Sequence, residues 1–166
     1  MAEMFLWIDG IQGESTDKFM EKVKPGHIEI QTWGWTVENP VHWDVNQGGQ
    51  STKATIKHFD VGKTCDQGSV ALYQYCVTGK HFKKAHIICR KNDGVDKINY
   101  LTIEMEDVMI QHVGWSGQGE SQMLTENIQI QCAEFTLKYR TQRDDGNAAD
   151  GDVHFGFNVQ TQVQRY

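Results

Sequence analysis

The chain has 166 residues, with 16 Lys and Arg against 22 Asp and Glu, which gives a formal net charge of −6. We expect one domain, residues 1–166, because a chain of this length can bury a core without a disulfide or a metal. The acidic balance, with no block of basic residues, argues against nucleic acid as a partner.

The first apolar segment, residues 3–9, is rich in Phe, Leu, Trp and Ile and predicts a strand. No basic region precedes it, and it ends at Asp9 after about five apolar residues, too few for a signal peptide or a membrane span. We therefore expect a protein that is made and first folded in the cytoplasm, without contact with a membrane. Residues 16–26 are polar and predict a surface connection with at most one helical turn.

A long strand is predicted over residues 27–39, where β-branched and aromatic residues are concentrated and Pro40 ends the pairing. The two isoleucines of residues 28–30 are at even positions, whereas the two tryptophans of residues 33–35 are at odd positions. Either a bulge near Gln31 separates the two halves, or the strand buries side chains on both faces.

Residues 40–52 follow as a predicted loop, and a loop of more than about a dozen residues is unusual inside a compact domain. This loop carries Val41 and Trp43 among glycines and amides. Exposed apolar side chains of this kind indicate packing on a second molecule, so they are a first sign of assembly. Residues 53–61 then alternate as a strand.

One helix is predicted, over about residues 66–78. Asp66 can cap its start, and Gly79 supplies the left-handed residue that ends it. An apolar stripe along the segment indicates that the helix packs against a sheet.

Strands are predicted over residues 82–91 and 95–106, joined by an Asn-Asp-Gly turn that favours a hairpin. Residues 107–113 are expected to form another short strand. In the long strand over residues 124–140, the buried residues change from even to odd positions, which predicts a bulge near Ala133 and Glu134. The expected core residues are Trp33, Trp35, Ile128, Ile130, Phe135 and Leu137.

The sequence offers no pattern for catalysis, a metal or a cofactor. Its seven His residues show neither a helical i, i+4 pair nor a His-x-His pair, and its four Cys residues include no Cys-x-x-Cys. His27 and Glu29 match half of the zinc deaminase signature, but the cysteine half is missing. We therefore predict a protein that is not an enzyme.

Ordered segments along nearly the whole chain resemble the tube protein of bacterial type VI secretion, the haemolysin-coregulated protein (Hcp) family. The set as a whole is far more specific than any one segment. The segments are Met4-Phe5-Leu6-x-Ile8-Asp9-Gly10-Ile11-x-Gly13-Glu14-Ser15, Ile28-Glu29-Ile30-x-x-Trp33-x-Trp35, Gly79-Lys80-His81, Arg90-Lys91, Tyr100-Leu101-x-Ile103, Leu124-Thr125-Glu126-x-Ile128 and Tyr139.

The resemblance implies a mainly β fold, a small antiparallel β-barrel of two packed sheets with one flanking α-helix. It also implies homo-hexameric rings that stack into a hollow tube, carry effectors in the lumen, meet the spike and sheath of the type VI apparatus, and are secreted without a signal peptide. The extended loop at about residues 38–52 would contact the next ring through Val41, Trp43, Asn46 and Gln47. The inner wall would present Thr32, Gly34 and Thr36 to the lumen and its effectors.

Pattern alone leaves open which face Gly34 occupies, because the register of its strand is unsettled. In the family this position, between the two tryptophans, is more often Ser. A second reading of the chain also remains open, a monomeric secreted β-sandwich that binds a sugar or a cell-surface ligand. Such a module would need exposed aromatic residues on a concave face.

Overall fold

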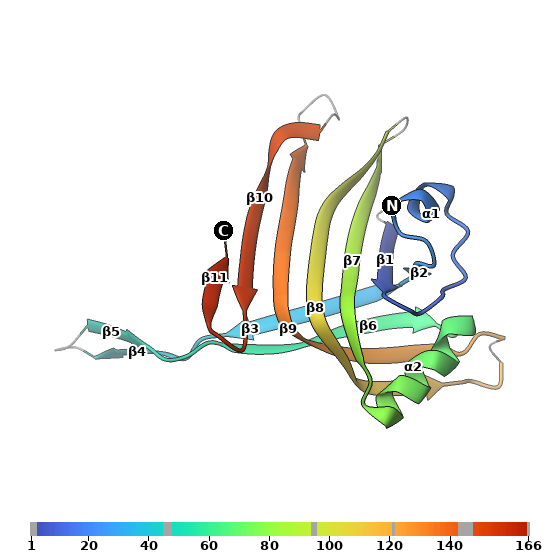
Figure 1. The fold of residues 1–166 in the computed structure, drawn as a ribbon, viewed down its shortest axis with the longest axis horizontal. Coiled ribbons are helices and arrows are strands. Elements are labelled where there is room, and N and C mark those ends of the chain that lie inside the picture. Colours follow the sequence, from blue (N-terminus) through green and yellow to red (C-terminus); the bar gives the residue numbers. More distant parts are fainter. Residues whose placement is uncertain (1–2, 45–47, 94–95, 121, 143–147, 166) are drawn as a thin grey trace.

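The computed structural model describes residues 3–44, 48–93, 96–120, 122–142 and 148–165, shown in Figure 1. Strands predominate, as predicted. The elements are β1 (Glu3–Ile8), α1 (Lys18–Val23), β2 (Ile28–Glu29), β3 (Thr32–Glu38), β4 (Val41–Asp44), β5 (Gly48–Ser51), β6 (Thr55–Thr64), α2 (Gln67–Thr78), β7 (His81–Asp93), β8 (Asp96–Ser116), β9 (Thr125–Gln142), β10 (Ala148–Asn158) and β11 (Val163–Arg165).

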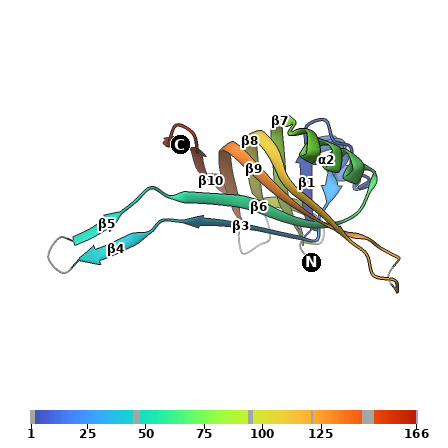
Figure 2. The same ribbon diagram turned by 90° about the horizontal axis from the view of Figure 1, so that it is seen from below.

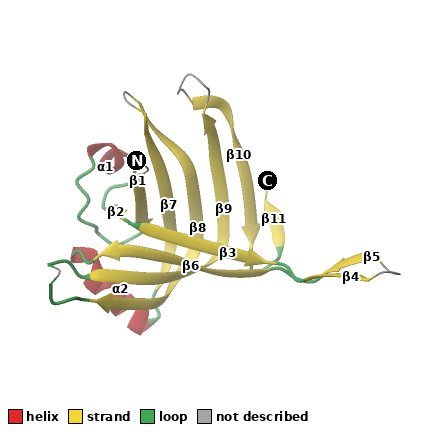
Figure 3. Cartoon of the chain, turned by 180° about the vertical axis from the view of Figure 1, so that it is seen from behind, coloured by secondary structure: helices red, strands yellow, loops and turns green. Residues whose placement is uncertain are grey.

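One antiparallel sheet contains nine of the described strands. Its main path runs β11-β10-β9-β8-β7-β1-β2, while β6 pairs with both β9 and β3. β8 and β9 are long enough to belong to two layers, and in Figure 3 the layer with β3 and β6 crosses below the upright strands. The name lower layer is used below for β3, β6 and the parts of β9 and β8 that continue the sheet beside β6.

The chain from β2 to β3 connects the two layers at Gln31. Ile30 donates its backbone N–H to Met4 of β1 (3.0 Å), and Gln31 donates its own to Gly62 of β6 (2.8 Å). The interruption predicted near Gln31 is therefore present as a change of partner strand. β1 pairs with β7, β7 with β8, β8 with β9, and β9 with β6. Between β1 and β6 the link is the chain itself at residues 30–31.

The core fills the space between the layers. Ile128 and Ile130 are fully buried at even positions and Phe135 at an odd one, so the predicted change of parity in β9 is present. The register with β8 has no shift at Ala133 and Glu134, where a bulge was predicted. The facing residue Asp107 instead has a positive φ of 50°, so the distortion lies on the partner strand. Leu137, Trp33 and Trp35 are partly buried and pack against the same core.

Three predictions about the elements need correction. A second helix is present, the six-residue α1, which Asp17 caps by accepting hydrogen bonds from two backbone N–H groups. Residues 40–52 were predicted as a loop, but β4 and β5 pair there as a two-stranded sheet. The short strand expected at residues 107–113 is part of the continuous β8, which is 21 residues long.

The predicted ends of α2 are confirmed. Asp66 caps its start in a reciprocal arrangement with Ser69, and Gly79 ends it in the left-handed conformation at φ 64°. Neither of the two helices in the described ranges is long and apolar enough to cross a membrane.

Candidate functional site: a polar sheet face with two open edges

The even-numbered residues of β3 face away from the core. Thr32 and Thr36 are exposed, while Trp33 and Trp35 between them pack on the core cluster. A Cβ atom added to Gly34 would meet no other atom within 4 Å. Gly34 therefore lies on the outer face of the lower layer and opens it to solvent.

The same outer face continues across the layer as a row of amide side chains. Asp60 pairs with Gly34 on one side and with Gln129 on the other. Gln131 donates to Gln111 (3.2 Å), Gln111 donates to Gln129 (3.3 Å), and Gln129 donates to Asp60 (3.0 Å). This chain of hydrogen bonds holds the amides in place and gives a polar surface on which Asp60 is the charged member of the row.

The lower layer has two open edges within the described part of the chain. β3 pairs with β6 only, and β8 loses its β7 partner after Met109, so residues 110–116 pair with β9 alone. Since all neighbours are antiparallel, the strands at the two edges run in opposite directions. Edge strands are commonly protected by charged residues or proline, yet residues 110–116 contain none of Asp, Glu, Lys, Arg or Pro.

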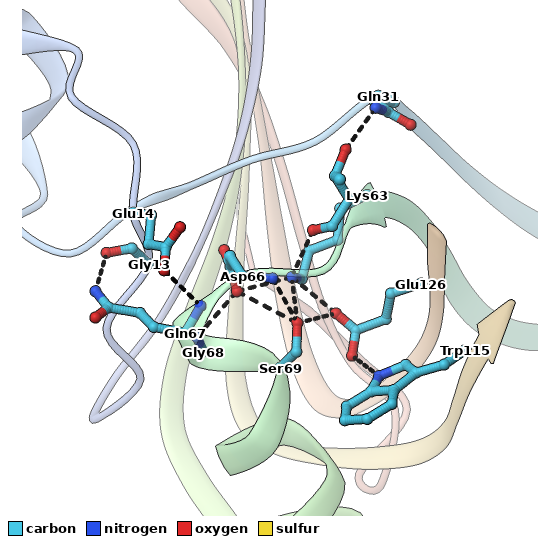
Figure 4. Close-up of polar contacts among 11 residues, drawn as sticks. Gly13, Glu14, Gln31, Lys63, Asp66, Gln67, Gly68, Ser69, Trp115 and Glu126 are labelled. Carbon is cyan, nitrogen blue, oxygen red and sulfur yellow. Dashed lines mark hydrogen bonds and ion pairs between the residues drawn. The ribbon is translucent and has the colours of Figure 1, made fainter. Parts of the chain in front are cut away.

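A buried ion pair fastens α2 to this layer (Figure 4). Lys63 Nζ lies 2.7 Å from Glu126 Oε2 and 2.9 Å from Asp66 Oδ1, with both Lys63 and Glu126 side chains fully buried. Ser69 donates to Glu126 (2.8 Å), and the Trp115 indole N–H donates to the second oxygen of Glu126 (2.7 Å). One carboxylate thus connects β6, β8, β9 and α2.

The amino-terminal connection is also held against α2. Gln67 donates its backbone N–H to Glu14 (2.9 Å) and its side-chain amide to the carbonyl of Gly13 (2.8 Å). These contacts, visible on the left of Figure 4, satisfy a donor at the helix start that would otherwise lack a partner.

A second buried ion pair holds α1 against β1 and β7. Arg90 is fully buried and donates to the carboxylates of Glu3 (2.7 Å) and Asp17 (3.0 Å). These hydrogen bonds from Arg90 hold the pKa of Asp17 well below its usual range. Arg90 and the two carboxylates are paired with each other, so we assign this cluster a structural role.

The ribbon formed by β4 and β5 extends away from the body as a continuation of β3 and β6 (Figure 2). Trp43 is 81% exposed on it and Val41 49%. Trp43 pairs with Gly49, and a Cβ on Gly49 would lie 2.9 Å from the indole ring, so a larger residue there would displace the ring. Asn46 and Gln47, also predicted to act in this segment, lie outside the described residues.

Sequence reasoning missed the residues that complete the polar face, namely Asp60, Gln111, Gln129 and Gln131. Their proximity depends on strand register, for which the sequence carries no signal beyond alternation. Within the described ranges, no three His, Cys, Asp or Glu residues are grouped closely enough to hold a metal ion.

Solved structures of type VI secretion proteins share this fold. One, described as a type six secretion system protein, matches with a TM-score of 0.90 and 25% identity over 99% of this chain and all of the other. A type VI secretion system effector from Yersinia pestis matches with a TM-score of 0.73 and 29% identity over 94% of this chain and 99% of the other. The architecture is thus that of a type VI secretion protein.

The sequence gives the family. Residues 5–139 match the model of the family described as "Type VI secretion system effector, Hcp", so the chain belongs to the Hcp family. Protein hcp1 of Pseudomonas aeruginosa is 29% identical over 163 residues, which is 98% of each chain. The family comprises tube and effector proteins that the type VI system secretes.

Proposed function

We propose that this chain is the subunit of a type VI inner tube, in which six copies form a ring and rings stack into a hollow conduit. The observation that best supports this is the lower layer, with its two uncapped edges of opposite direction. The edge of β3 in one copy is antiparallel to the edge of residues 110–116 in a copy rotated beside it. A contact between two different surfaces closes into a ring when the rotation fits.

In such a ring the polar outer face would line the lumen. Thr32, Gly34 and Thr36 and the amide row would then meet the cargo. A surface with many neutral donors and acceptors can bind varied proteins weakly, because it imposes no strong charge. Effectors held there during assembly would be protected until the apparatus pushes the tube outward and both are released.

The β4–β5 ribbon would contact the adjacent ring. Trp43 and Val41 are too exposed for a segment stabilised by its own chain, since an isolated two-stranded hairpin is marginally stable in water. Burial against a second ring would stabilise both. We extend this proposal to Asn46 and Gln47 on the sequence resemblance alone. The ends of such a tube would contact the spike, and its outside would contact the sheath.

Native mass spectrometry of the purified chain tests the ring directly. We expect a species of six copies of the 19.0 kDa chain. The competing proposal, a monomeric binding module, requires a single copy at all concentrations. A chain that stays monomeric at high concentration and remains folded would rule out the tube.

Substituting Gly34→Gln tests the lumen. The new side chain has room, because nothing lies within 4 Å of the Cβ position, so rings should form normally by size-exclusion chromatography. It would fill space next to Asp60 on the polar face, and we expect cargo recovered with the rings to fall several-fold. Val153→Gln, at an exposed position on β10 outside the lower layer, is the matched control. Unchanged cargo recovery with Gly34→Gln would exclude this face as the binding surface.

A further inference from the structure

The outer side of α2 carries an apolar stripe and no charged residue. Val70, Tyr73 and Val77 follow at helical spacing and are 66%, 43% and 79% exposed. The helix, Gln67–Thr78, has no Asp, Glu, Lys or Arg in its sequence, although 23% of the whole chain is charged. An exposed helix face without charge is unusual on a soluble surface and indicates a surface that another protein covers.

A groove of about 250 Å³ opens at the other side of the molecule, and its lining residues are all apolar. Trp35 forms its floor, stacked on Phe59 with ring centres 4.4 Å apart. Val37 and Phe155 at its rim are 49% and 39% exposed. The groove therefore offers an apolar side chain a preformed place of burial.

The helix and the groove flank the two open edges of the lower layer. Tyr73 of α2 contacts Trp115 of the β8 edge, with ring centres 4.8 Å apart. The groove is bordered by Trp35 and Val37 of the β3 edge. β3 and α2 lie on opposite sides of the molecule in Figure 2. Both the helix and the groove lie on the core side of the layer, opposite the polar face.

The two features also lie at the same level along the strands. The carboxyl end of α2, with Val77, leads into β7, whose pairing with β8 begins at Met109. Ile110, the next residue of β8, pairs with Ile130 of β9. Ile130 pairs in turn with Phe59 of β6, and Phe59 pairs with Trp35 of β3, so Ile110 and Trp35 lie in the same row across the lower layer. Joining the β3 edge of one copy to the β8 edge of the next therefore brings Val77 next to the groove.

We propose that α2 of one copy docks its apolar stripe, led by Val77, into this groove of the next copy. The inference rests on the proposed ring, and it names the contact on which that ring depends. The occupant is a second copy of this chain because a single rotation joins both the edges and the apolar surfaces. The contact lies outside the lumen, so it leaves the polar face free.

Cross-linking tests the docking independently of the ring. The double variant Val37→Cys with Val77→Cys, treated with a short bis-maleimide, should give a denaturing-gel ladder extending to six copies. The single variants measure the background from the four native cysteines. The pair Val23→Cys with Val77→Cys is the matched control, because Val23 is similarly exposed but lies on α1, away from the groove.

A charge at the contact gives a second readout. Val77→Glu should reduce the hexamer fraction at least tenfold while circular dichroism stays unchanged, because the glutamate would be buried without a partner. Thr78→Glu adds the same charge beside the stripe and should keep its rings. The docking proposal is wrong if Val77→Glu forms hexamers as the wild type does and no cross-linked ladder exceeds background. The tube proposal is unaffected by that result. If the wild type forms no hexamer, the tube itself fails.

Discussion

Replacing Glu126 by alanine is expected to lower the free energy of unfolding by about 3–5 kcal/mol, the usual cost of removing one partner of a buried ion pair. The variant leaves Lys63 fully buried without its closest carboxylate, which lies 2.7 Å away in the native protein. It also leaves the Trp115 indole N–H without its acceptor. Urea unfolding followed by tryptophan fluorescence measures the difference.

Glu106→Ala is the matched control for this measurement. Glu106 also pairs with a lysine, Lys84, at 3.5 Å, but both side chains are about half exposed. Exposed pairs contribute only about 0–1 kcal/mol, so we expect a much smaller loss. Equal losses in the two variants would show that burial does not set the strength of the Lys63–Glu126 pair.

Acidification from pH 7 to pH 4 is expected to destabilise the wild-type protein through His86. Burial lowers the pKa of His86 from its ordinary 6.5 to about 4, with Lys24 adding to the effect. The unfolded chain therefore binds a proton at a higher pH than the folded chain. His86 contributes its full stability above about pH 6.5, and this contribution, up to about 3 kcal/mol, is lost as the pH falls to 4.

The variant His86→Gln should flatten this dependence. It keeps a polar side chain but removes the titration, so the slope of unfolding free energy against pH between 4 and 6.5 should become smaller than in the wild type. Asp17 does not interfere, because its lowered pKa makes its contribution disappear only below this window. Parallel pH curves for the two proteins would show that His86 is protonated equally in the folded and unfolded chains.

Local signals in the sequence predicted the features that depend on neighbouring residues. The ends of α2 follow from Asp66 and Gly79, whose capping chemistry operates within one helical turn. The change of partner at Gln31 follows from the shift between even and odd apolar positions. Both predictions needed only side-chain periodicity and backbone preference, which a sequence displays directly.

Features that depend on distant pairing were missed or misread. Residues 48–51, Gly-Gly-Gln-Ser, have little β propensity and form β5 because β4 pairs with them. Helix α1 has only six residues, too few to show a helical period, and Arg90 of the distant strand β7 binds its cap residue Asp17. The amide row and the groove combine residues from several strands, so they exist only once the register is set.

The alignment of the ribbon with β3 and β6 has a mechanical consequence. A force along the ribbon enters the body along its strands, where the hydrogen bonds to β9 cross the direction of load. Bonds placed in this way share a longitudinal load together, whereas a sideways pull would open them one after another. The body is therefore expected to resist a pull along the ribbon better than a pull across it, and in the proposed tube the first direction would be the one from ring to ring.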